Sequence, residues 1–217
     1  MRVDFHIHTS FSRDSSIMPE ELIEKALDEN IQCLAICDHK TINGALLTMR
    51  LAFSKPILII PGIEISTKAG DVLALGIKRK ISDGLSFEKT ISEIKKQNAF
   101  VIIPHPFGKP TPFKSSLNHP EIHAIEGING ATLKILNKKV FKISHKLNKP
   151  LIANSDAHSI EEFGNVFFEI PDGAQNQNDV FKAIVENKIT IPEEISSLKD
   201  SIKINNVFKR LYCKHFT

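Results

Sequence analysis

The segments VDFHIH (3–8), CLAIC (33–37) and ILIIPGIEI (57–65) decide the fold, because each is a short apolar run of the kind that forms a buried strand. The residues between them, at 20–30 and 44–53, have helical periodicity. Further strands are predicted at 71–77, 100–104, 124–128, 150–155 and 166–170, and further helices at 86–97, 132–147 and 178–186. Strands that alternate with helices indicate a parallel sheet covered by helices. Seven or eight such strands predict an α/β barrel.

The length of 217 residues fits one domain of ordinary size. The barrel is expected to span 1–192, and the segment 193–217 is expected to be a helical extension packed on it. The loop 106–120 has four prolines and directly follows His105. It is long for a compact domain and is therefore expected to border a site.

The composition favours a cytoplasmic protein. The three cysteines are Cys33, Cys37 and Cys213, an odd number that suits a reducing compartment. No signal peptide is expected, and the apolar runs are far shorter than the ~20 residues that span a bilayer. A net charge of +3 is too small to establish a nucleic-acid partner. No obligatory protein partner is evident.

The strongest local signal for chemistry is the pair His6 and His8 in the first predicted strand. Side chains two apart in a strand point to the same face, so both imidazoles can reach one metal ion. Two half-buried histidines bonded to backbone carbonyls are the competing interpretation.

Other candidate ligands stand at the carboxyl ends of predicted strands, namely His39, Glu64, His105, Asp156 and His158. In a parallel barrel these ends meet at one rim, where active sites of such barrels are built. Imidazoles and carboxylates without thiolate suit Zn, Mn or Fe, and the ligands outnumber what one tetrahedral ion can use. Two to three divalent ions are therefore expected, and a pair of ions can stabilise phosphoryl transfer.

The motifs DFHIHTSFSRDS, AICDHKT, PGIEIS, IIPHP and NSDAH, in this order, resemble those of the PHP (polymerase and histidinol phosphatase) superfamily, particularly its small stand-alone phosphoesterases. The resemblance covers residues 1 to 170. It implies a distorted seven-stranded, TIM-like (β/α) barrel whose C-terminal rim holds a trinuclear metal site.

The resemblance also implies the ligand set. The first metal would be bound by His6, His8, Glu64 and Asp156, the second by Glu64 and His105, and the third by Asp14, His39 and His158. Glu64, Asp156 and His158 are the implied catalytic residues. The chain departs from the family where a ligand histidine is often found, because it has Leu73 there. The second metal would therefore have fewer protein ligands. Lys40 also stands where an aspartate is common.

Five other polar residues are weaker candidates. Lys40 and Lys109 could bind phosphate, and Asn129 could contact substrate or a metal-bound water, although a solvated or hydrogen-bonded role is as simple for each. Glu126 could be a base, and Asp38 is expected to orient a ligand. Lysines at 134, 138, 142 and 146 follow one face of a predicted helix, which is either a solvated face or a polyanion site.

These observations predict a metal-dependent phosphoric ester hydrolase that cleaves phosphomonoesters or phosphodiesters through a metal-bridging hydroxide. The expected substrate is a small phosphorylated molecule, nucleotide-like in character, or a short oligonucleotide. Two alternatives stay open. An amidohydrolase-like barrel would hydrolyse amides or lactones, and an idle barrel would bind nucleic acid or protein.

Overall fold

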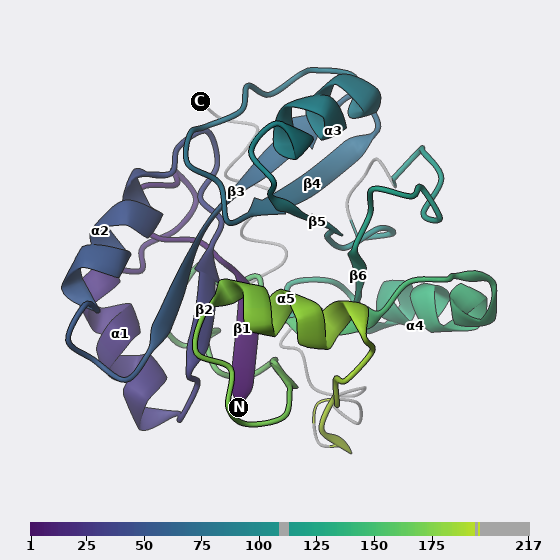
Figure 1. Ribbon diagram of the computed structural model, residues 1–217. Coiled ribbons are helices and arrows are strands. Elements are labelled where there is room, and N and C mark those ends of the chain that lie inside the picture. The colour runs from purple at the N-terminus through teal and green to yellow at the C-terminus, as the bar shows by residue number, and fades with distance from the viewer. Residues whose placement is uncertain (109–112, 194, 196–217) are drawn as a thin grey trace.

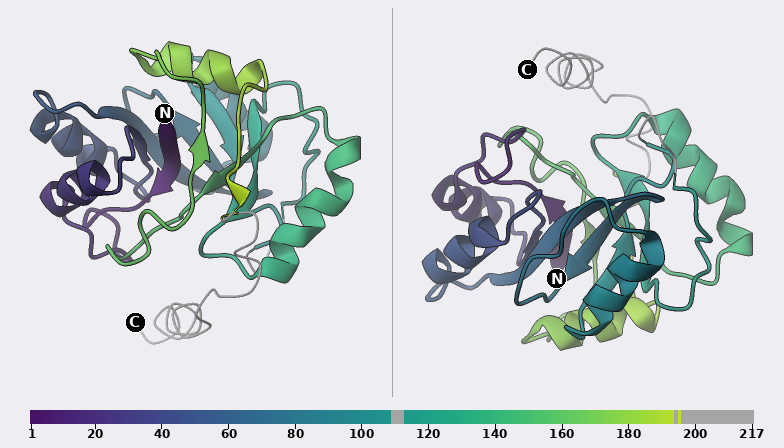
Figure 2. Two further views of the ribbon diagram at one scale, coloured as in Figure 1. Left: turned by 90° about the horizontal axis from the view of Figure 1, so that it is seen from below. Right: turned by 90° about the horizontal axis from the view of Figure 1, so that it is seen from above.

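The computed structural model describes residues 1–108, 113–193 and 195. One sheet of eight strands nearly closes into a barrel with helices around it (Figures 1 and 2). Its strands are β1 (Arg2–Ile7), β2 (Cys33–Ile36), β3 (Leu58–Thr67), β4 (Gly70–Leu75), β5 (Phe100–Ile103), β6 (Ala124–Asn129), β7 (Leu151–Asn154) and β8 (Phe168–Glu169). The helices are α1 (Pro19–Asp28), α2 (Asn43–Leu51), α3 (Phe87–Lys95), α4 (Lys134–Ile143) with the short η1 (Ser144–Lys146), and α5 (Gln177–Val185). Each element predicted up to residue 186 is present.

The sheet is not wholly parallel, which corrects the prediction from the sequence. Strands β1 to β3 run parallel to one another, as do β5 to β7, but β4 is antiparallel to both β3 and β5. The physical reason is the short turn between β3 and β4, where Thr67 pairs with Gly70. A turn of this length can only reverse the chain, whereas a parallel crossover needs a dozen or more residues.

The barrel closes between β1 and β7 largely through side chains. The Phe5 N–H donates to Asn154 Oδ1 at 2.9 Å and the Ser155 N–H donates to Asp4 Oδ1 at 3.1 Å. At the rim, Ile7 and Ala157 form a parallel bridge, and the His8 N–H donates to the Ala157 carbonyl. The two-residue β8 adds antiparallel to the first residues of β1. Strands β1 to β7 thus form the barrel, and β8 is a short addition to it.

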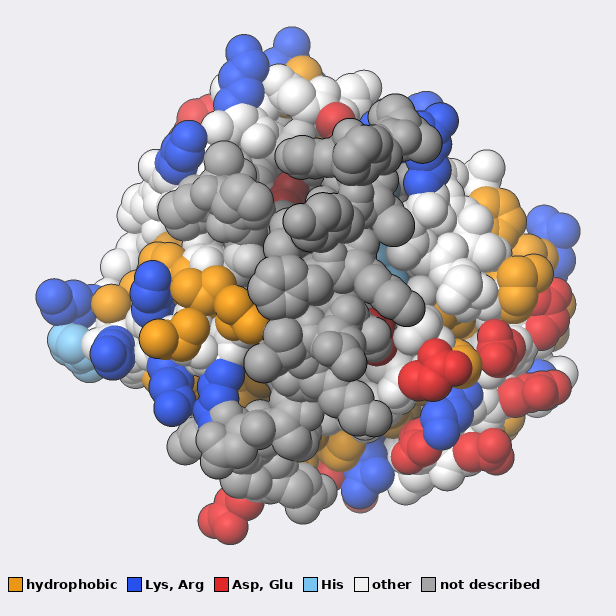
Figure 3. All heavy atoms as spheres, turned by 180° about the vertical axis from the view of Figure 1, so that it is seen from behind, with side chains coloured by type: hydrophobic (Ala, Val, Ile, Leu, Met, Phe, Trp, Pro, Cys, Tyr) orange, Lys and Arg blue, Asp and Glu red, His pale blue; other side chains and the backbone are white. Residues whose placement is uncertain are grey.

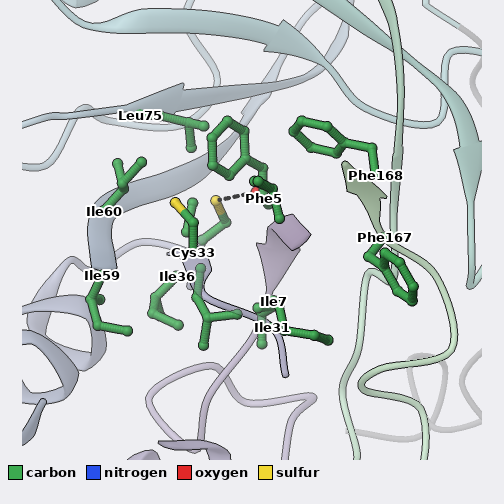
Figure 4. Packing of buried hydrophobic residues seen from close by; sticks show 14 of the residues in the cluster. Phe5, Ile7, Ile31, Cys33, Ile36, Ile59, Ile60, Leu75, Phe167 and Phe168 are labelled. Atoms are coloured by element: carbon green, nitrogen blue, oxygen red, sulfur yellow. Dashed lines mark hydrogen bonds between the residues drawn. The ribbon is translucent and has the colours of Figure 1, made fainter. Parts of the chain in front are cut away.

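The hydrophobic core fills the barrel and is closed at one end by α5. Figure 4 shows Phe5, Cys33, Ile60 and Leu75 among the residues that meet inside. The ring of Phe181 on α5 stacks on Phe100 with ring centroids 4.4 Å apart, at the end where the parallel strands begin. Helix α5 therefore blocks this end and leaves the opposite rim for a site.

The cysteines in the described part of the chain are core residues. Cys33 and Cys37 are buried, unpaired with each other, and burial raises the pKa of both thiols, as expected of small core residues. Most of the predicted extension 193–217 lies outside the described residues. Among the described helices, none combines the length and the apolarity needed to cross a membrane. The cytoplasmic location stays a prediction.

Gly44 in the first turn of α2 has no space for a side chain. A Cβ there would lie 1.9 Å from Asp38 Oδ2 and 2.4 Å from Thr9 Oγ1. Alanine is the better helix former by ~1 kcal/mol, but crowding of this kind costs about 1–3 kcal/mol. We expect Gly44→Ala to lower the Tm by several degrees, measured by thermal unfolding. The exposed Asn43→Ala in the same turn is the control, and an increase in Tm for Gly44→Ala would contradict the packing.

Candidate metal centre

The eight predicted ligands gather at the rim opposite α5. In the described part of the chain, the donor atoms form three sets, and the atoms within each set lie within 4.8 Å of one another. The sets are His6, His8 and Asp156; His6, Glu64 and His105; and His8, Asp14, His39 and His158. Each set combines residues on or just after β1 with residues from other strands. Glu64 reaches the centre from the middle of β3 because the chain continues past it into the hairpin with β4.

The first group has the dimensions of a tetrahedral metal site. His6 Nε2 and His8 Nε2 are 3.1 Å apart, and each lies 3.3–3.4 Å from Glu64 Oε2 and 3.4 Å from Asp156 Oδ1. Tetrahedral ligands at ~2.0–2.1 Å from an ion are about 3.3–3.4 Å from one another. The four atoms therefore fit around one ion.

The hydrogen bonds of His6 point its free nitrogen toward this group. His6 Nδ1 lies 2.8 Å from Glu126 Oε1, and because a carboxylate only accepts, the proton belongs on Nδ1. Nε2 then presents a lone pair to two carboxylate oxygens and a second imidazole. Burying lone pairs that converge in this way costs free energy unless a cation lies between them, so these residues fit a bound metal.

Glu64 connects the first group to the second. Its Oε2 faces His6 and His8, whereas its Oε1 lies 3.1 Å from His105 Nε2. Glu64 Oε2 is also 3.4 Å from His39 Nε2. One fully buried carboxylate thus touches imidazoles of all three groups, and it would be shared between them if ions were bound.

The third group is more open. Asp14 Oδ2 lies 3.6 Å from His39 Nε2 and 3.7 Å from His158 Nε2, and all three side chains are partly exposed. His158 Nδ1 is 2.9 Å from the Asp156 carbonyl, so its proton belongs on Nδ1 and Nε2 keeps its lone pair. The ring of His158 stacks on His8 at 4.2 Å between centroids. This group therefore stands nearest to solvent.

Unusual backbone angles occur beside the centre. His105 has a φ of 30°, Asp156 of 51° and Lys40, which follows His39, of 63°. Non-glycine residues seldom adopt positive φ, and such residues persist at functional sites when the surrounding structure holds them. At Asp156 and His105 the chain leaves its strand in this conformation. The sequence carries no signal for it.

Glu126 organises the inner side of the centre. Its Oε1 accepts from Asn154 Nδ2 at 2.9 Å as well as binding His6, and its Oε2 accepts the His105 N–H and Asn129 Nδ2, each at 2.8 Å. Residues 126 and 129 would face opposite sides of a regular strand. They face the same side because β6 has an irregularity between Glu126 and Ile128 relative to β7. Glu126 is therefore an orienting residue.

Asp38 holds the loop that follows β1. It accepts from the Thr9 N–H and hydroxyl, both at 2.7 Å, and from Ser12 Oγ at 3.2 Å. Ser12 Oγ in turn accepts the His39 N–H at 2.8 Å. The orienting role predicted for Asp38 agrees with these contacts.

Asp4 belongs to the same buried network, and sequence reasoning missed it. It is fully buried with Oδ2 unpartnered among the described residues, and burial raises its pKa to about 7. Its position in the closing seam explains why the sequence gives no signal, since its partner Ser155 lies 151 residues away.

The predicted substrate residues have different surroundings. Lys40 is exposed beside His39. Asn129 is fully buried, and its Nδ2 bonds to Glu126 at 2.8 Å and to Asp156 Oδ2 at 3.2 Å, which favours positioning of Asp156 over contact with substrate. Lys109 lies outside the described residues.

Comparison with known proteins agrees with this geometry. A model of the PHP domain matches residues 4–100, and a model described as PHP-associated matches residues 134–189. The protein MJ1587 of Methanocaldococcus jannaschii, which is uncharacterized, is 35% identical over 49% of this chain and 68% of its own length. The chain belongs to the PHP domain family.

Other similarities to the PHP domain are partial or concern the fold. The 5'-3' exoribonuclease Rnm of Escherichia coli is 32% identical over 44% of this chain but only 33% of its own length. A structure from Bifidobacterium adolescentis, provisionally designated a metal-dependent phosphoesterase, superposes with a TM-score of 0.58 at 13% identity, covering 94% of this chain and 98% of its own. An amidohydrolase from Chromobacterium violaceum, with bound sulfate and no metal, gives 0.61 at 16%, covering 88% and 98%. The last two support the barrel fold alone.

In this PHP domain Leu73 lies directly beside the centre. It pairs with Glu64 across the β3–β4 hairpin, so both side chains point to the same face, and Leu73 is fully buried. We expect Leu73→His to add a nitrogen near Glu64 and His105 and to increase metal retained after dialysis. Leu73→Gln is the control for polarity, and elemental analysis is the measurement. Unchanged retention would place Leu73 outside the ligand sphere.

Proposed function

We propose that the chain is a metal-dependent phosphoesterase that hydrolyses phosphate esters of nucleotides or short oligonucleotides. Two to three divalent ions, Zn, Mn or Fe, would be held by His6, His8, Asp14, His39, Glu64, His105, Asp156 and His158. The observation that carries the proposal is the convergence of lone pairs on one rim, with Glu64 shared between the groups. Nitrogen and oxygen donors without thiolate suit these metals.

Bound ions of this kind supply a hydroxide at neutral pH and neutralise charge on a phosphoryl group. The protein residues hold and orient them. Glu126 fixes the tautomer of His6, and the Asp156 carbonyl fixes that of His158. Asn129 donates to Asp156 Oδ2, which leaves Asp156 Oδ1 free for the first group. His158 is partly exposed, and its Nε2 lies 3.7 Å from Asp14 Oδ2, where both would hold an ion at the solvent side of the centre.

The solvent side of the centre supports an anionic substrate. Arg13 is exposed next to Asp14, and Lys40 is exposed next to His39. These cations stand beside the most open group of donors, where a phosphate would enter. The exoribonuclease activity named for the E. coli relative acts on phosphodiesters, which agrees in chemical class. The nucleotide part of the proposal rests on that relative and on charge.

The two alternatives are less consistent with the site. An amidohydrolase with a similar barrel would be expected to have a carbamylated lysine where this chain has Glu64. A binding module without activity would not need donor atoms that converge on one rim, so the convergence supports the catalytic proposal. An amidohydrolase would cleave amides or lactones and not phosphate esters, so one panel of substrates distinguishes the two functions.

The test uses full-length protein stripped with chelator and reloaded separately with Mn²⁺, Zn²⁺ or Fe²⁺. The panel contains p-nitrophenyl phosphate, bis-p-nitrophenyl phosphate, a 5'-phosphorylated dinucleotide, an amide and a lactone. We expect metal-dependent cleavage of at least one phosphate ester and none of the amide or lactone. Turnover of the amide or lactone alone, or equal activity with and without metal, would overturn the proposal.

A further inference from the structure

The lysines of α4 and η1 form a surface that the proposed centre does not use. We define the α4 lysine face as Lys134, Lys138, Lys139, Lys142 and Lys146. Four of the ten residues of α4 are lysines and none is acidic. Within the described ranges, no carboxylate lies within ion-pair distance of the last four of these lysines, and those four are exposed.

This concentration of charge is unfavourable for the isolated protein. Lys138, Lys142 and Lys146 follow one another at i,i+4 spacing, and each such like-charged pair costs roughly 0.2–0.5 kcal/mol. Other lysine-bearing helices differ, because Lys25 on α1 pairs with Glu29 and Lys96 after α3 pairs with Glu93, both at 2.6 Å. A polyanion along α4 would relieve the repulsion.

Charge is also separated across the molecule. Residues 19–29, which include α1, hold five acidic side chains and one lysine. Figure 3 shows lysine and arginine side chains gathered with exposed hydrophobic ones on the side where α4 lies, and acidic ones gathered on the side of α1. A long anion is therefore directed to α4 and away from α1.

Helix α4 is joined to the strand end that borders the metal centre. Asn137 in the second turn accepts from the Asn129 N–H at 3.3 Å and donates to the Asn129 carbonyl at 3.0 Å. Asn129 in turn bonds to Asp156. The helix therefore starts at the rim and extends away from it, and Lys142 lies ~12 Å along the axis from Lys134. This geometry presents a row of charges to successive phosphates.

Apolar side chains alternate with the lysines. Leu133, Ile135 and Phe141 are 43%, 67% and 44% exposed. Surfaces that bind single strands combine a row of cations, which follows the backbone, with aromatic side chains on which bases stack, and Phe141 is the aromatic residue here. An acidic protein would also match the charge of the lysines. A nucleic acid, however, has one phosphate for the lysines and one flat base for the apolar side chains in every nucleotide.

We propose that the α4 lysine face binds single-stranded nucleic acid and guides its end into the metal centre. This inference rests on the proposed phosphoesterase function for its catalytic part, but the binding itself does not need turnover. It predicts that long substrates depend on α4 and that short ones do not.

The test compares Lys138→Glu/Lys142→Glu with the control Lys89→Glu/Lys182→Glu. The control lysines are exposed on α3 and α5, and the change in net charge is identical. Binding of fluorescein-labelled oligouridylate is measured by anisotropy in chelator, so no activity is needed. We expect the α4 variant to weaken binding at least tenfold, and the slope of log K against log salt to fall by about 1.4, or ~0.7 per lost phosphate contact. The control should bind as wild type does.

A second measurement uses the metal-loaded enzymes. The α4 variant should cleave the 5'-phosphorylated dinucleotide normally and show a higher KM for oligouridylate. Unchanged oligouridylate binding by the α4 variant, an equal loss in the control, or equally tight lysine-dependent binding of polyglutamate would overturn the inference. Absence of all phosphoesterase activity with α4-dependent binding intact would instead count against the proposed function alone.

Discussion

Glu64→Gln should reduce turnover of a phosphate ester by more than the ~10–100-fold that loss of an orienting partner costs, because it would remove the carboxylate that the proposed metal groups share. Glutamine keeps the volume but replaces one carboxylate oxygen with an NH₂ group, which cannot bind a cation. Glu64 touches both His6 and His105 groups, so we expect the metal content to fall by at least one ion per chain. Kinetics and elemental analysis of the same preparation measure the two effects.

The matched control for this change is Glu24→Gln on the exposed side of α1. It should leave both turnover and metal content unchanged. If Glu64→Gln retained full activity with a full complement of metal, Glu64 would not be a bridging ligand. If the variant lost its secondary structure, measured by circular dichroism, the conservative Glu64→Asp would replace it in the same comparison.

Metal should raise the Tm of the stripped protein by roughly 10–20 °C. Each site filled at a hundred times its Kd contributes about 2.7 kcal/mol, and ~1 kcal/mol moves the Tm of a domain this size by about 2–4 °C. Two filled sites give the stated range. Thermal unfolding with increasing Mn²⁺ or Zn²⁺ measures it, and Asp156→Ala should reduce the increase. A Tm that does not respond to any divalent ion would argue against a metal centre.

The size of this increase should grow with pH. Burial lowers the pKa of His6 and His8, but Asp156, Glu64 and, for His6, Glu126 outweigh it and raise both above the ordinary 6.5. Raised pKa values stabilise the metal-free protein below pH 6.5, and this stabilisation is lost as pH rises through the folded-state pKa values. Metal binding requires unprotonated imidazoles and so strengthens over the same range. We expect a larger metal-induced Tm change at about pH 8 than at about pH 6; a change that shrinks would contradict the ligand assignment.

Much of the fold and of the candidate site followed from local patterns. All eight strands were predicted because each is an apolar run bounded by polar or turn residues, and that signal is local. The convergence of His39, Glu64, His105 and Asp156 followed from the rule that the ends of parallel strands share a rim, and the pairing of His6 with His8 followed from their spacing of two in one strand. The antiparallel β4 could not change this result, because Glu64 stands on β3 before the hairpin turns.

The sequence by itself therefore determined which residues can serve as donors and on which edge of the sheet they meet, because strand period and strand order are encoded in neighbouring residues. Only the tertiary structure decided how they are held. The irregularity of β6 that turns Glu126 and Asn129 to one side, the positive φ of His105 and Asp156, and the seam at Asp4 all depend on partners far along the chain. Asp4 and Ser155 are 151 residues apart, and no local pattern reports a contact that forms only when the barrel closes.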